Sequence, residues 1–99
     1  MNEKDLIKIG NIYRNKDQDD YILISFKQIG METFLKIKNI VEEYEHKIYP
    51  QKSIKIYEDI DLDSFLSELS DCGIYVNVKN YKIELFQTIS EFAENTHSA

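Results

Sequence analysis

Apolar and polar residues alternate along two segments near the N-terminus, residues 7–13 and 21–27. The apolar positions of the second segment are Ile22, Ile24 and Phe26. Alternation of this kind is typical of a strand with one buried face. Gly10 interrupts the first segment and indicates a β-bulge. Because only the polar residues 15–20 separate the two segments, the pattern predicts a β-hairpin with a turn in this stretch.

The period changes from two to between three and four in residues 31–48, which predicts a long amphipathic helix. Its apolar positions are Phe34, Ile37, Val41, Tyr44 and Ile48. Pro50 cannot continue such a helix, because it lacks a backbone N–H. The alternative is a strand over residues 33–40, whose first residues are rich in β-formers. We favour the helix because the periodicity is sustained over the whole segment.

Alternation returns in residues 53–58 and predicts a strand with Ile54 and Ile56 on one side and Lys55 and Tyr57 on the other. A second helix then begins at Asp61 or Asp63, both of which are good N-cap residues. Its apolar face consists of Leu62, Phe65, Leu66, Leu69 and Cys72. Gly73 follows at the position where a left-handed C-terminal cap is expected.

Two further strands, residues 74–78 and 81–85, are predicted around a turn at Lys79 and Asn80. The run from Thr88 to Glu91 matches a capping box and predicts a short final helix. The apolar face of that helix is formed by Ile89, Phe92 and Ala93. Residues 96–99 are expected to fray.

The predicted order is β-β-α-β-α-β-β-α, which indicates a single α+β domain over residues 1–99. We expect a sheet of five strands, mixed or antiparallel, with the helices on one face. The longest apolar run is only residues 22–24, and no signal-peptide stretch is present, so we expect no membrane segment. The single Cys72 excludes an intramolecular disulfide and, with the other features, favours a cytoplasmic location.

The acidic residues are concentrated in the second half of the chain. Residues 1–57 have a net charge of +1 and residues 58–99 a net charge of −7, which together give the net charge of −6. Such a surface repels nucleic acid and anionic lipid and attracts basic partners. The preference for Ile, Lys and Asn over Ala and Arg is typical of an AT-rich genome, such as that of a low-GC bacterium or a phage.

No catalytic or metal-binding constellation is evident, so we expect a protein that is not an enzyme and has no cofactor. Cys72 lies on a predicted apolar helix face, and neither His46 nor His97 is spaced to activate it. Residues 59–63 resemble the start of a calcium loop, but Ser64 and Ser70 stand where that loop needs Gly and Glu. The glycines are scattered, and Arg14 is the single arginine, which argues against nucleotide or direct nucleic-acid binding.

Protein recognition is the remaining class of function. We predict a partner-binding surface made of Tyr57, Glu58, Asp59, Asp61, Asp63, Glu68, Asp17, Asp19 and Asp20. Tyr57 would be an exposed aromatic anchor rimmed by carboxylates. Helix capping offers another explanation for Asp61 and Asp63. The leading hypothesis is a small acidic protein that neutralises a basic partner. It would be an immunity protein against a bacterial nuclease-type toxin, or a phage-type inhibitor of a nucleic-acid-handling protein. The alternative is a non-catalytic adaptor or a homo-oligomeric structural protein.

Overall fold

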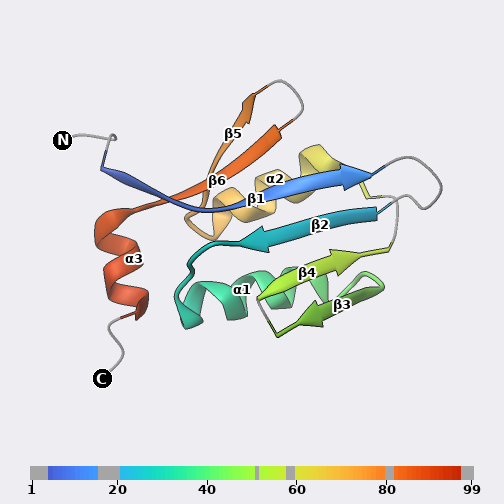
Figure 1. Ribbon diagram of the computed structural model, residues 1–99, viewed down its shortest axis with the longest axis horizontal. Coiled ribbons are helices and arrows are strands. Elements are labelled where there is room, and N and C mark those ends of the chain that lie inside the picture. The colour runs from blue at the N-terminus through green and yellow to red at the C-terminus, as the bar shows by residue number, and fades with distance from the viewer. Residues whose placement is uncertain (1–4, 16–20, 51, 58–59, 80–81, 97–99) are drawn as a thin grey trace.

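The computed structural model describes residues 5–15, 21–50, 52–57, 60–79 and 82–96, and the side chains up to residue 93. Its elements are β1 (Leu6–Asn15), β2 (Tyr21–Phe26), α1 (Met31–Val41), β3 (His46–Tyr49), β4 (Ser53–Ile56), α2 (Leu62–Asp71), β5 (Tyr75–Lys79), β6 (Lys82–Thr88) and α3 (Ile89–Thr96). All strand pairs in these ranges are antiparallel, and the sheet order is β3-β4-β2-β1-β6-β5 (Figure 1). The α+β class is confirmed, with six strands where five were expected.

The N-terminal hairpin forms as the alternation predicts. β1 and β2 pair from Gly10↔Phe26 to Asn15↔Tyr21. The predicted bulge is present, because the register of β1 against β6 shifts between Lys8 and Gly10. A Cβ atom at Gly10 would collide with the backbone carbonyl of Ser25 on β2, so the bulge requires glycine. The predicted turn at residues 15–20 falls, beyond Asn15, outside the described residues.

The core lies between one face of the sheet and the helices α1 and α2, which both lie behind the sheet in Figure 1. The strands contribute Ile9, Ile12, Ile22, Ile24, Phe26, Ile54, Ile56, Ile83 and Leu85. The helices contribute Ile37, Val41, Phe65 and Leu69. α3 packs at one end, against α1, β1 and β6. The helices therefore cover one face of the sheet, and its other face carries half-exposed and exposed side chains.

The predicted helix over residues 31–48 is wrong in its second half. α1 ends at Val41, and His46–Tyr49 form the edge strand β3. A tight turn follows the helix. In this turn the N–H of Tyr44 donates to the carbonyl of Val41 over 2.9 Å. Three carboxylates, at residues 42, 43 and 45, follow at the negative end of the helix dipole, where they oppose its extension. The alternative strand over residues 33–40 is also wrong, because this segment is helical.

The second predicted helix is confirmed at both ends. α2 has Asp61 as its N-cap residue, and the chain leaves it through Gly73 at a φ of 84°, in the left-handed region. Phe65 and Leu69 are buried, while Leu62, Leu66 and Cys72 are half-buried.

The C-terminal elements differ from the prediction in detail. Lys79 lies within β5 and pairs with Lys82, so it is not part of the turn, and Asn80, the other predicted turn residue, lies outside the described residues. The N-terminal cap of α3 is confirmed, because the N–H of Glu91 donates to Thr88 Oγ1 over 3.1 Å. Only Phe92 of the predicted apolar face packs on the core, since Ile89 and Ala93 are exposed. Thr96 ends α3, and residues 97–99 lie outside the described residues.

Candidate functional site

The two layers of the molecule carry different charges. The helices bear the exposed or half-exposed carboxylates Glu32, Asp63, Glu68, Asp71 and Glu91, with the flanking Glu42, Glu43 and Asp61. Their lysines, in the described residues, are Lys36 and Lys38 on α1. Strand alternation places Lys8, Lys47, Lys55, Lys79 and Lys82 on the opposite, uncovered face of the sheet. We call this the open face.

α2 is acidic along its whole length. Asp61 Oδ2 accepts a hydrogen bond from the hydroxyl of Ser64 over 2.9 Å, and Asp61 makes no side-chain cap to the helix backbone. Asp63 lies in the first turn, where a carboxylate stabilises the helix dipole. Asp71 lies in the last turn, which contains no basic residue, so its charge opposes the dipole. The helix dipole therefore accounts for Asp63 but not for Asp71, which the predicted surface omitted.

Five of the nine predicted partner-binding residues cannot be placed. Glu58, Asp59, Asp17, Asp19 and Asp20 lie outside the described residues. Among the others, Asp61 and Asp63 are exposed and Glu68 is half-buried, and all three belong to α2 and its N-cap.

Tyr57 is exposed as predicted, at 41% of its surface, but it faces the other side of the sheet from α2. Its N–H donates to the carbonyl of Glu45 over 2.8 Å, which extends the β3–β4 ladder by one residue. Alternation then places its ring beside Lys55, whose Nζ lies 5.2 Å from the ring centroid. The structure therefore groups Tyr57 with lysines of the open face and not with the carboxylates of α2.

A compact group of aromatic and basic side chains surrounds Tyr57. This tyrosine–lysine cluster consists of Tyr21, Tyr49, Tyr57, Lys47 and Lys55. Lys55 Nζ lies 4.2 Å from the ring centroid of Tyr21, and Lys47 Nζ lies 5.2 Å from that of Tyr49. A hydrogen bond with Tyr49, followed by partial burial, raises the pKa of Tyr57 above its usual value. These contacts link three strands, β2, β3 and β4, into one surface.

The sequence prediction missed this cluster because it assigned residues 46–48 to a helix. The signal was present as alternation in the sequence His46-Lys47-Ile48-Tyr49, immediately before Pro50. Such alternation over four residues is short, and the helical period of the preceding segment runs into it.

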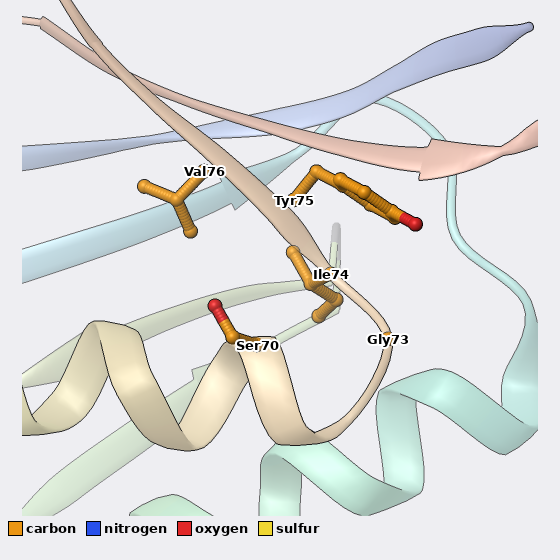
Figure 2. A pocket seen from close by; sticks show the side chains of 5 residues that line it. All are labelled: Ser70, Gly73, Ile74, Tyr75 and Val76. Atoms are coloured by element: carbon orange, nitrogen blue, oxygen red, sulfur yellow. The ribbon is translucent and has the colours of Figure 1, made fainter. Parts of the chain in front are cut away.

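A shallow pocket of about 440 Å³ opens between α2 and β5 (Figure 2). Its lining consists of Ser70, Gly73, Ile74, Tyr75 and Val76. The hydroxyl of Ser70 points from α2 toward β5, and none of the described residues that line the pocket offers a carboxylate or imidazole as its base. The pocket can accommodate a small side chain, and its lining does not form a nucleophile–base pair.

Cys72 and His46 lie in separate settings. Cys72 is half-buried beyond the end of α2, and burial raises the pKa of its thiol. The ring Nδ1 of His46 lies 2.7 Å from the carbonyl of Tyr44 on the connection into β3. Among the described residues, no three His, Cys, Asp or Glu side chains come close enough together to hold a metal ion.

No helix in the described ranges is long and apolar enough to cross a membrane. The chain matches no protein-family model, no curated protein and no solved structure at a significant level of similarity.

Proposed function

We propose that this protein is a small acidic cytoplasmic inhibitor that binds and neutralises a basic protein. An immunity protein against a bacterial nuclease-type toxin is one form of this function, and a phage-type inhibitor of a nucleic-acid-handling protein is another. The observation that carries the proposal is the uniform charge of α2 and its flanks. Every charged residue between Lys55 and Lys79 is acidic.

A surface whose charges are all negative suits an inhibitor of a basic protein. It steers a basic partner during diffusional encounter and repels other acidic proteins. It can also compete with nucleic acid for the basic groups of a nuclease. Asp71 supports this proposal, because a carboxylate in the last turn of α2 is unfavourable for the helix dipole.

The test is co-purification of the tagged protein from its own host at low ionic strength, followed by kinetics with the captured partner. We expect the association rate to fall steeply with added salt. The product of a neighbouring gene, if it encodes a basic toxin, is the first partner to assay. An association rate that is insensitive to salt would contradict the electrostatic account.

Charge reversal identifies the surface. We expect the double variant Asp63→Lys and Glu68→Lys to slow association by about tenfold or more at low salt. The matched control is Glu42→Lys with Glu43→Lys, which makes the same change of charge at the end of α1. Equal effects of the two double variants would indicate that net charge, and not the α2 surface, governs binding.

The second candidate is an adaptor or homo-oligomeric protein, and the tyrosines of the open face favour it. Tyr13, Tyr57 and Tyr75 are 46%, 41% and 49% exposed and come from three separate parts of the sheet. Exposed aromatic residues on one surface are typical of protein interfaces. Light scattering that finds only monomers over a wide range of concentrations would contradict the homo-oligomer.

A further inference from the structure

The open face places lysines directly opposite one another on neighbouring strands. Lys47 on β3 pairs with Lys55 on β4, and Lys79 on β5 pairs with Lys82 on β6. Like charges at directly opposed positions destabilise a sheet. The fold therefore maintains two repulsive pairs on a single face.

Protection of the sheet edges explains only half of this arrangement. β3 and β5 are edge strands, where a lysine discourages pairing with another chain. Protection of an edge strand can therefore explain Lys47 and Lys79. Lys55 lies on β4, between β3 and β2, and Lys82 lies on β6, between β5 and β1, so neither is at an edge. Their positions call for a different explanation.

The register continues the β3–β4 pair into an apolar strip. Lys55 pairs with Leu23 on β2, and Leu23 pairs with Tyr13 on β1. One row across four strands thus runs from two ammonium groups to a half-buried leucine and an exposed tyrosine. Tyr21 and Tyr49 flank this row with hydroxyl groups that can donate hydrogen bonds.

We propose that this row is a docking surface for an acidic segment of a protein partner, distinct from the basic partner of α2. Carboxylates of the segment pair with Lys47 and Lys55 and remove their mutual repulsion. An aliphatic side chain of the same segment packs on Leu23 and Tyr13. Tyrosine anchors beside charged groups are a frequent composition of binding hot spots.

The same contacts disfavour single-stranded nucleic acid. Base stacking needs the face of an aromatic ring. The ammonium group of Lys55 lies over both Tyr21 and Tyr57 and covers one face of each ring. The open-face strand positions carry no arginine, and the chain as a whole has a net charge of −6. A protein carboxylate needs only the ammonium groups and the hydroxyls.

The experiment titrates the isotope-labelled full chain with a short peptide of alternating Glu and Leu, and follows the backbone amides by NMR. We expect shifts along β2, β3 and β4 and at Tyr13, and little change along α2. A matched titration uses oligodeoxythymidine as the probe. Stronger binding of the oligonucleotide at the same residues would show that the ligand of this surface is nucleic acid and not an acidic protein segment. Absence of peptide binding would overturn the surface itself.

Two variants of one residue separate binding from folding. Lys55→Glu should weaken the peptide by about tenfold, and Lys55→Arg should retain most of the affinity. Lys55→Glu exchanges the contacts of Lys55 with the Tyr21 and Tyr57 rings for a favourable pair with Lys47, so the variant should stay close to the parent in stability, which urea unfolding checks. The control is Lys38→Glu on α1, which makes the same charge change on the helix layer and should not alter peptide affinity. Equal loss in both Lys→Glu variants would overturn the assignment.

The proposal is independent of the function assigned to α2. The Asp63→Lys and Glu68→Lys variant should keep peptide affinity, and Lys55→Glu should keep affinity for a basic partner. The two opposite surfaces also allow association between copies of the chain. Light scattering of the parent, the α2 double variant and Lys55→Glu tests this association. If the parent self-associates and both variants do not, the open face binds a second copy, and the proposal of a separate acidic partner is wrong.

Discussion

The side chain of Gln87 donates a hydrogen bond from Nε2 to Thr33 Oγ1 over 3.0 Å, in the buried space between β6 and α1. Both residues are almost fully buried. This bond joins the end of β6 to the first turn of α1.

Thr33→Val should lower the free energy of unfolding by about 1–3 kcal/mol, because it leaves the buried Gln87 amide without this acceptor. Urea unfolding measures the loss. The double variant Thr33→Val with Gln87→Leu removes both groups and should be close to the parent in stability. If the two single effects simply add in the double variant, the side chains are not coupled.

Because of the bulge at Gly10, we expect the addition of a single methyl group there to lower the stability of the fold strongly. Gly10→Ala directs its Cβ into the carbonyl of Ser25, which belongs to the backbone of β2 and cannot move aside alone. We expect a loss of about 1–3 kcal/mol or more in unfolding experiments. Gly73→Ala is the comparison, because the atoms nearest to its Cβ belong to the flexible carboxylate of Glu91 and its cost is mainly that of a positive φ. A smaller loss for Gly10→Ala than for Gly73→Ala would contradict the close approach of β1 and β2.

Acid should weaken the fold in part through Glu84. Hydrogen bonds from Lys8 and Asn77, each 3.1 Å long, lower the pKa of this carboxyl below its usual value. A carboxyl whose pKa is lower in the folded chain stabilises the fold above its unfolded pKa, and this contribution is lost as the pH falls through the folded pKa. NMR titration of the Glu84 carboxyl measures the pKa directly. Glu84→Gln should flatten the acid limb of stability against pH, and an unchanged limb would contradict the assignment.

Cys72 should react slowly with thiol reagents in the native protein. Burial raises its pKa, so less thiolate is present at neutral pH than in an exposed cysteine. The rate of reaction with Ellman's reagent should rise with pH and should increase sharply in denaturant. A native rate equal to the denatured rate would show that Cys72 is neither shielded nor shifted.

The periodicity that predicted the long helix correctly indicated which residues face the core. Burial alone does not determine whether the backbone is a helix or a strand. Ile37 and Val41 face the core from α1, Tyr44 faces it from the following turn, and Ile48 faces it from β3. Tyr44 even packs edge-on against Phe65, with ring centroids 6.5 Å apart. The spacing of three and four therefore survives the change from helix to strand. The charges indicated where the helix ends, because consecutive glutamates at the C-terminal end of a helix are unfavourable for its dipole.

The candidate surfaces were predictable to different degrees. α2 and its acidic side follow from its own sequence, because a helix with clear caps fixes which residues face outward. The open face could not be derived in the same way, since Lys47 and Lys55 become neighbours only through pairing of β3 with β4. Strand pairing is a long-range choice that local alternation leaves open. Tyr57 was therefore correctly predicted as exposed, while its lysine neighbours were not foreseen.

Ionisation of Tyr57 offers a spectroscopic view of the tyrosine–lysine cluster. Its pKa is raised chiefly by the hydrogen bond with Tyr49 and then by burial. Tyr49→Phe removes that bond and should lower the pKa of Tyr57 toward its usual value of 10.0. Absorbance titration of the phenolate, with Tyr57→Phe used to identify its contribution, measures the change. The control is Tyr75→Phe, because Tyr75 lies on the edge strand β5 and is not a member of the cluster. If Tyr49→Phe and Tyr75→Phe shift the titration equally, the contact between Tyr49 and Tyr57 does not hold the cluster together.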